Sequence, residues 1–447
     1  MLFLYIMAYA IDLFCGAGGC SEGLLQAGFK ILFSSDISPM VEETYRHRHE
    51  QLGLIQGVNT WFEREDIRNL TSETIWNRIN QLECFNDGIH QAPTDIDLII
   101  GGPSCQGFSR AGRRDPNDPR NMLFGEYVRI INEMHPKYIV LENVEGFMDM
   151  QFFGYVGIHG HIYEDGSVTP DILRSELHEI GYETLPTQIL NAADFGVPQR
   201  RRRVFFIGYR DHQPVPRYPT PTHLNNHIPL QDAISDLIRI PEIRDNIPES
   251  PYQVESRNGR TPDINGNPIP VQNNLTCTEL SNITEVVKER FSLFHQGESG
   301  TYLRRRVIEE GIDLTDKPAL LELCERELHL DRNEVIELFL HGNPTEEQID
   351  VLLTKKNIRQ RWSPDQPSAT IVSIADDYIS PWEPRTFSVR EMARCQSFDD
   401  SFEFLGKRTT GGLSRRTEVP QYTQVGNAVP PLLARAVVTE ILHCLEQ

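Results

Sequence analysis

The chain has 447 residues, 39% of them hydrophobic, which is enough for a large core and more than one domain. It has 43 Lys or Arg against 64 Asp or Glu, and the net charge of −21 argues against nucleic acid as a partner unless basic residues cluster locally. Such clusters occur at 110–114, 200–203, 304–306, 359–361 and 415–416, although each alone is more often a solvated face.

The first 14 residues and the cysteines limit the environment of the protein. The opening stretch is apolar apart from Asp12, lacks a basic leader and is shorter than the roughly 20 residues that span a bilayer, so we interpret it as a buried strand. Eight cysteines without a C-x2-C pair favour neither a disulfide framework nor a zinc site. We therefore expect a cytoplasmic protein with no bound metal and no membrane contact.

Up to about residue 210, short β-branched runs alternate with helix-like stretches. This alternation predicts parallel strands joined by crossover helices, an α/β sheet of the doubly wound, Rossmann-like kind. Such sheets bind ligands beyond the carboxyl ends of their strands. The runs lie at 8–14, 31–34, 96–100, 138–141 and 204–207.

The composition shifts to Pro, His and Asn around Pro214–Pro229, which we interpret as a boundary after a first domain, 1–222. A second, irregular domain is expected at 223–385, with helical stretches near 320–330 and 334–340. A C-terminal segment, 386–447, ends in an amphipathic helix over 430–446 that is expected to return to the first domain.

The first motif in the chain is a glycine turn between a strand and a helix, Asp12–Gly19. Its glycines, Gly16 and Gly18, let the backbone approach a ligand closely. Asp36 follows the next apolar run, where a nucleoside-binding sheet places a carboxylate on ribose hydroxyls. The turn alone could serve NAD, FAD or simple packing.

The second motif presents a cysteine on a glycine-proline turn after a buried strand, at 99–109. The thiolate of Cys105 could be stabilised by Arg110, Arg113 and Arg114 and act as a nucleophile. A lone cysteine is more often an inert, small hydrophobic residue.

Two further motifs supply titratable and cationic side chains. Glu142 lies at the end of the hydrophobic run 138–141, a setting that can hold a proton near neutral pH, although a strand-end Glu is usually solvated. In Phe195–Val204 strand alternation places Arg201 and Arg203 on one face and Arg200 and Arg202 on the other. One pair can therefore face a site.

These four motifs in this order, with Gln424–Pro430 near the C-terminus, resemble the cytosine-5 DNA methyltransferase family, of the prokaryotic restriction-modification type. The resemblance covers roughly 9–210 and 385–440. It implies transfer of a methyl group from S-adenosylmethionine to carbon 5 of a flipped-out cytosine in a specific double-stranded DNA sequence. The irregular domain would then be the target-recognition domain.

The resemblance also implies roles for individual residues. Cys105 would attack carbon 6, Glu142 would donate to ring N3, Arg203 would orient the cytosine carbonyl and Arg201 would support the loop. Asp36 would hold the ribose of the cofactor, and Asp66 its adenine. The remaining residues implied for the cofactor site are Phe14, Gly16, Gly18, Ile67, Pro103 and Asn427.

The sequence departs from the family pattern at Ser104, where a second proline is more usual, so we expect a somewhat freer loop. Thr370 and the stretch 389–396 resemble the family's frame around the recognition domain, and a structural role is favoured for both.

Three other interpretations remain open at this point. An RNA cytosine-5 methyltransferase would share the catalytic residues, but the more than 170 residues between Arg203 and Arg390 favour duplex DNA. A catalytically silent DNA-binding homologue is disfavoured because Cys105, Glu142 and Arg203 are all present. A nicotinamide oxidoreductase rests on the first turn alone. We expect a monomer, with a cognate restriction endonuclease acting separately.

Overall fold

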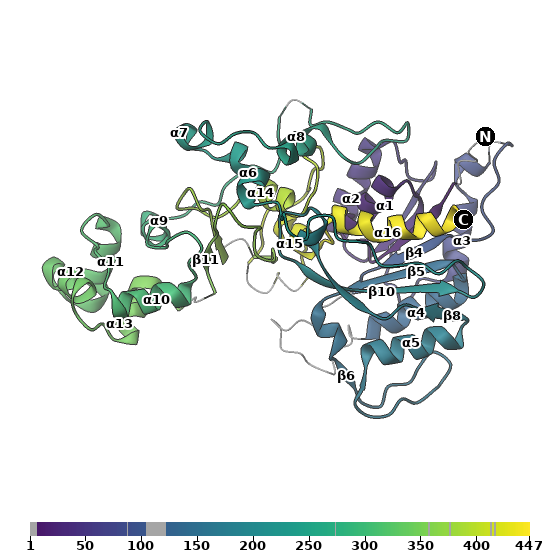
Figure 1. Cartoon of the computed structure of the whole chain (residues 1–447), viewed down its shortest axis with the longest axis horizontal. Coiled ribbons are helices and arrows are strands. Elements are labelled where there is room, and N and C mark those ends of the chain that lie inside the picture. The colour runs from purple at the N-terminus through teal and green to yellow at the C-terminus, as the bar shows by residue number, and fades with distance from the viewer. Residues whose placement is uncertain are drawn as a thin grey trace.

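The computed structural model describes residues 7–86, 88–103, 122–272, 274–355, 358–374, 377–411, 414 and 417–447. Its centre is an eight-stranded sheet in the order β3-β2-β1-β4-β5-β10-β8, with β9 paired to β10 (Figure 1). The strands are β1 (Tyr9–Leu13), β2 (Lys30–Asp36), β3 (Trp61–Arg64), β4 (Leu98–Gly101), β5 (Tyr138–Asn143), β8 (Tyr182–Thr184), β9 (Gln188–Asn191) and β10 (Arg202–Arg210).

The first five strands of the sheet are mutually parallel, whereas β10 runs antiparallel to β5, β8 and β9. Chain order reverses between β1 and β4, whose ends Leu13 and Gly101 lie in register. This is the switch point at which doubly wound sheets bind ligands. The predicted α/β fold is confirmed, and each of the five predicted strand runs overlaps an observed strand.

Two hydrophobic layers cover the two faces of the sheet. Alternate residues of β4 point to opposite layers, Leu98 and Ile100 to one and Ile99 to the other. The first layer is covered by α1 (Gly19–Ala27) and α16 (Pro431–Leu445), and the second by α3, α4 and α5 (Figure 1). The bounds of the other helices here are α2 (Pro39–Gln51), α3 (Ser72–Asn80), α4 (Leu123–Met134) and α5 (Thr169–Glu179).

The contact between α1 and α16 depends on two glycines one helical turn apart. A Cβ on Gly19 would lie 2.2 Å from the carbonyl oxygen of Val429, and one on Gly23 would lie 2.5 Å from the Cβ of Ala434. The stretch 421–445 is long and apolar enough to resemble a membrane-crossing helix. It is, however, two helices, α15 (Gln421–Asn427) and α16, and α16 packs in the core against α1.

Residues 285–353 form a helical module with a hydrophobic core separate from those of the sheet, at the left of Figure 1. Its helices are α9 (Glu285–Ser292), α10 (Gly300–Glu309), α11 (Pro318–Leu328), α12 (Arg332–Leu340) and α13 (Glu346–Leu353). The predicted helical stretches correspond to α11 and α12, whereas α9, α10 and α13 were expected to be irregular. These three are short helices that begin at the polar caps Thr284, Ser299 and Thr345.

The boundaries between the three predicted domains stay a prediction, although the separate core of the helical module agrees with a second domain.

The remaining elements are short. Beside the module lies the two-stranded pair β11 (Gln360–Arg361) and β12 (Tyr378–Ile379). The others are η1 (Glu83–Phe85), η3 (Glu145–Met148), β6 (Gln151–Phe152), β7 (Ser167–Val168), η4 (Ala192–Phe195), α6 (Leu230–Ile234), η5 (Ser235–Leu237), α7 (Pro241–Arg244), α8 (Pro251–Asn258) and α14 (Val389–Cys395).

Candidate active site

The glycine turn follows β1 at the switch point of the sheet. Phe14, Gly16 and Gly18 all have positive φ, at 56°, 53° and 100°, so the chain reverses tightly before α1 begins. The amide of Gly18 donates to the carbonyl of Cys15 at 3.0 Å. A Cβ on Gly16 would meet nothing within 4 Å, so the space over this residue is open.

Asp36, at the end of β2, is joined to this turn. Its Oδ2 accepts from the Gly16 amide at 3.1 Å and its Oδ1 accepts from the Ser38 amide at 2.9 Å. Burial raises the pKa of Asp36, and these backbone hydrogen bonds offset part of the rise. The structure therefore brings Gly16 and Asp36 together, as a site for a nucleoside requires.

A buried polar network beneath the turn was not predicted from the sequence. Asp12 Oδ2 accepts from Ser21 Oγ at 2.6 Å, and the Tyr45 hydroxyl lies 2.7 Å from Ser21 Oγ and 2.5 Å from Ser34 Oγ. Burial raises the pKa of Asp12 to about 7. The only sequence signal was a carboxylate within an otherwise apolar strand. The network ties α1, β2 and α2 to the base of the turn.

Asp66 and Ile67, beyond β3, are less clearly part of the site. Asp66 binds the guanidinium of Arg68, with one oxygen 2.9 Å from Nε, and this hydrogen bond lowers the pKa of Asp66. Ile67 is buried, and its carbonyl accepts from Arg129 Nη2 at 2.9 Å. Because the Asp66 carboxylate is engaged by its own neighbour, its role toward an adenine stays a prediction.

Glu142 and Arg203 face each other at the end of β5. Arg203 Nε lies 3.0 Å from Glu142 Oε1, and both side chains are nearly buried, at 12% and 11% exposure. Burial raises the pKa of Glu142, and the charges of Arg203 and Arg201 offset part of that rise. This is the setting in which a carboxyl can retain a proton, as the sequence indicated.

Strand β4, which precedes Cys105 in the chain, lies directly beside this pair. A Cβ on Gly102 would lie 3.2 Å from Glu142 Oε2, so a side chain here would crowd the Glu142 carboxylate. Asn143 Nδ2 donates to the carbonyl of Pro103 at 3.1 Å. Residues 104–121, which include Ser104, Cys105 and the arginines at 110–114, lie outside the described residues.

The arginine segment has the predicted alternation. Arg201 is buried, and it donates to the carbonyls of Ile371 at 3.1 Å and Gly426 at 2.9 Å. Arg200 and Arg202 are exposed, and Arg202 pairs with Glu145. Arg203 therefore faces Glu142, whereas Arg201 holds two distant segments of the chain.

Asn427 is the last residue of α15 and its side chain is exposed. The backbone next to it is fixed, because Arg201 binds the carbonyl of Gly426 and Val429 abuts Gly19 of α1. The turn 425–429 thus lies against the helix that follows the glycine turn.

Comparisons with known proteins agree with this arrangement. The family model for C-5 cytosine-specific DNA methylases matches residues 9–443. The chain therefore belongs to this family.

Curated relatives of this methylase include the type II methyltransferases M.DdeI and M.AgeI. M.DdeI, from Desulfomicrobium norvegicum, is 31% identical over 443 residues, covering 96% of this chain and 88% of the relative. M.AgeI, from Thalassovita gelatinovora, is 30% identical over 480 residues, covering 96% and 98%. A prophage-encoded E. coli protein named as a DNA modification methyltransferase has the same fold, with a TM-score of 0.62 at 21% identity over 98% of this chain and 100% of its own.

Membership in the family makes the chain a DNA cytosine-5 methyltransferase that uses S-adenosylmethionine. The nicotinamide interpretation is excluded, since the later motifs belong to the methylase. Among the described residues, no group of three or more His, Cys, Asp or Glu side chains could hold a metal ion.

Two basic clusters of the methylase stabilise the protein internally. Arg304 pairs with Glu346 and Asp350, and Arg306 pairs with Glu298. Arg361 donates to three backbone carbonyls, and Arg359 lies over the ring of Phe291, whereas Arg305 is 63% exposed and pairs with Glu309. The cluster at 415–416 lies outside the described residues.

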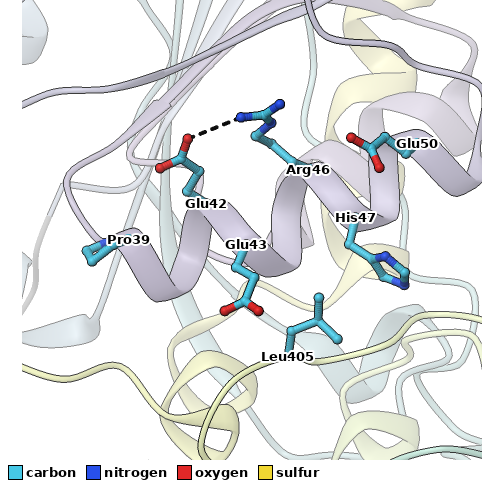
Figure 2. Close-up of a pocket in the computed structure, with 7 residues that line it drawn as sticks. All are labelled: Pro39, Glu42, Glu43, Arg46, His47, Glu50 and Leu405. Atoms are coloured by element: carbon cyan, nitrogen blue, oxygen red, sulfur yellow. Dashed lines mark hydrogen bonds and ion pairs between the residues drawn. The ribbon is translucent and has the colours of Figure 1, made fainter.

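A hollow lies along α2, between this helix and the segment that carries Leu405 (Figure 2). None of the predicted site residues lines it. Three carboxylates there disfavour a phosphate or a nucleic acid. The lining residues are Pro39, Glu42, Glu43, Arg46, His47, Glu50 and Leu405.

Proposed function

We propose that Cys105, Glu142 and Arg203 carry out the reaction, by covalent activation of a cytosine in duplex DNA. The observation that carries this proposal is the buried Glu142–Arg203 pair beside Gly102 and Pro103, at the strand ends next to the switch point. A proton donor and a fixed cation there can bind the polar edge of a pyrimidine.

The chemistry requires activation because carbon 5 of cytosine is a poor nucleophile. The Cys105 thiolate adds to carbon 6, while the carboxyl of Glu142 donates to ring N3 and offsets the charge that develops in the ring. Carbon 5 becomes enamine-like and accepts the methyl group. Loss of the carbon 5 proton and expulsion of Cys105 then restore the aromatic ring.

Covalent connectivity supports the assignment of Cys105. Two peptide units separate it from Pro103, so their Cα atoms are at most about 7.6 Å apart. Pro103 is itself anchored through its carbonyl to Asn143, the neighbour of Glu142. The thiol and the carboxyl are thus tethered to the same strand ends.

Arg203 holds the Glu142 carboxyl in place and is proposed to orient the cytosine carbonyl as well. Its guanidinium has five N–H donors, and Glu142 takes the one on Nε, while another is donated to the carbonyl of Arg202 at 2.8 Å. Donors therefore remain for a substrate oxygen. Arg201 is proposed to support the site through its hydrogen bonds to the carbonyls of Ile371 and Gly426.

The residues around the glycine turn fit S-adenosylmethionine. The open space over Gly16 admits a ligand, and the Asp36 carboxylate beside it can accept ribose hydroxyls. The further residues proposed for the cofactor are Phe14, Gly18, Asp66, Ile67, Pro103 and Asn427. When bound, the cofactor supplies a methyl group activated by a sulfonium.

The substrate is proposed to be a specific sequence in double-stranded DNA. Addition to carbon 6 needs access to a ring face, which stacking denies, so the base must be flipped out. The curated relatives are type II methyltransferases, which supports a place in a restriction-modification system with a separate cognate endonuclease. We propose that the enzyme acts as a cytoplasmic monomer.

Expression in a host that lacks cytosine methylation tests this function. Mapping of 5-methylcytosine across the genome is expected to show one recurring motif with the natural chain and none with Cys105→Ala. Cys84→Ala is the matched control, because Cys84 is a partly accessible cysteine that lies in η1. Methylation that persists in Cys105→Ala would contradict the mechanism. Methylation found only in RNA would show that the substrate is RNA and not DNA.

A further inference from the structure

Three segments that are far apart in the sequence meet at the buried side chain of Gln199. Its Nε2 donates to Gln396 Oε1 at 2.7 Å and to the carbonyl of Cys395 at 3.2 Å. Its Oε1 accepts from the amide of Ile371 at 2.8 Å. The side chains of Gln199 and Gln396 are fully buried, so water cannot replace these partners.

Gln396 extends this amide chain to the C-terminal turn. Its Nε2 donates to the carbonyl of Val425 at 2.7 Å and to that of Ala428 at 3.3 Å. Arg201 makes a second, parallel link, since it binds the carbonyls of Ile371 and Gly426. Both peptide groups of Ile371 are therefore held, and three carbonyls of the turn that carries Asn427 are held as well.

The segment that ends at Ile371 also lies directly along the arginine segment. The amide of Arg200 donates to the carbonyl of Ser368 at 2.8 Å, and Thr370 Oγ1 donates to the carbonyl of Arg200 at 2.7 Å. Any shift of 368–371 is therefore transmitted to the backbone that carries Arg203. The structural role expected for Thr370 and for the stretch 389–396 agrees with these contacts.

We propose that Gln199 and Gln396 are positioning residues for methyl transfer. Their two amides fix the end of the recognition region and the C-terminal turn against the arginine segment, so that these parts move as one unit around Glu142. Neither residue touches the reacting atoms. The inference rests on the proposed function, because the reaction whose geometry is fixed is the attack on cytosine.

The expected effect is on turnover. A misplacement of about 1 Å at a reacting centre can lower the rate about 100-fold. Binding of the DNA backbone depends on surface charge, which loss of the amide chain leaves unchanged. Loss of the amide chain should therefore lower kcat at the mapped target motif by about 10- to 100-fold, with a much smaller change in the KM for DNA.

The variant Gln199→Glu gives a readout that a purely structural role would not move. A protonated Glu at this position accepts from Ile371 through its carbonyl and donates to Gln396 through its hydroxyl, whereas the ionised form cannot donate. The kcat of Gln199→Glu relative to the natural enzyme should therefore rise as pH falls, at a temperature well below both melting points. Gln81→Glu, the same change on an exposed residue at the end of α3, should follow the natural enzyme at every pH.

A second variant, Gln199→Met, removes the amide without adding a charge and covers the case in which Gln199→Glu fails to fold. It should show the same loss of kcat at all pH values. If either folded variant turns over the mapped motif like the natural enzyme at every pH, the positioning role is wrong. If the natural enzyme itself forms no 5-methylcytosine in DNA, the proposed function has failed instead.

Discussion

The strand ends of the sheet and the helical module α9–α13 bury their charged groups in different ways. At the strand ends Asp12, Asp36 and Glu142 are enclosed, and burial raises the pKa of each. In the module the carboxylates lie mostly at the surface and pair with neighbouring cations such as Arg304 and Arg306. Raised carboxyl pKa values such as these are typical of functional sites.

The net charge of the module also distinguishes it from the strand ends of the sheet. Residues 285–353 contain 8 Lys or Arg and 16 Asp or Glu. Their net negative charge opposes contact with phosphates, so the electrostatic field of the module does not favour DNA binding. The exposed arginines Arg200 and Arg202 lie instead beside the active site.

The largest effect is expected from Glu142→Gln. The amide keeps the size of the side chain and can donate a hydrogen bond, but it cannot deliver the proton, so kcat should fall by about 10²- to 10⁴-fold. Steady-state methyl transfer to DNA of the mapped motif measures it. Glu145→Gln, three residues away on η3, should change kcat little, and an equal loss in both variants would contradict the special role of Glu142.

Phe339→Ala tests whether the module is a separate unit. Phe339 is fully buried in the core of the module, and its truncation should destabilise that core by about 3–5 kcal/mol. Hydrogen exchange should speed up within 285–353 and stay unchanged in the sheet, and cofactor binding should persist. Tyr302→Ala removes an aromatic side chain that is 59% exposed and should have little effect. Loosening of the sheet by Phe339→Ala would show that the two regions form one unit.

Arg203→Met should shift the pH profile as well as the rate. Arg203 lowers the pKa of Glu142, so its removal raises that pKa further, and the carboxyl stays protonated to higher pH. The alkaline limb of the kcat/KM profile should therefore move to higher pH. The maximum of kcat/KM should fall by about 10²- to 10³-fold because a fixed hydrogen-bond donor is lost. Arg202→Met changes an exposed side chain and should leave the alkaline limb at the same pH. A shift of the limb to lower pH in Arg203→Met would contradict the assignment of Glu142 as the proton donor.

The smallest effect is expected at the contact between α1 and α16. Gly23→Ala places a Cβ 2.5 Å from that of Ala434 and 2.7 Å from the amide nitrogen of Arg435. The helices must separate slightly, which should cost about 1–3 kcal/mol and lower the melting temperature. Gly411→Ala, where a Cβ meets nothing within 4 Å, is the control. Equal melting temperatures would show that α16 is not held by this contact.

The sheet and its strand-end residues could be predicted because their signals are local. A β-branched run predicts a strand, and the strand fixes which edge carries Asp36 and Glu142. Alternation placed Arg200 and Arg202 on one face, and both are exposed. The pairing of Arg203, on the other face, with Glu142 was not predicted.

Contacts between distant segments could not be predicted in the same way. Asp12 is enclosed by Tyr45 and Ser34 from other elements, and Gln199 reaches Gln396 across 197 positions. The engagement of Asp66 by Arg68 depends on side-chain geometry, which spacing does not reveal. In the module, apolar positions are divided among five short helices, so no single stretch has a long periodic pattern.

Covalent trapping tests the central claim most directly. Duplex DNA that carries 5-fluorocytosine at the mapped target cytosine cannot release fluorine as it would a proton, so the cysteine adduct should persist through denaturing electrophoresis. The natural enzyme should form this adduct when S-adenosylmethionine is present, and Cys105→Ala should form none. An adduct of equal yield with Cys105→Ala, or no adduct with an enzyme that methylates the same site, would contradict attack by Cys105.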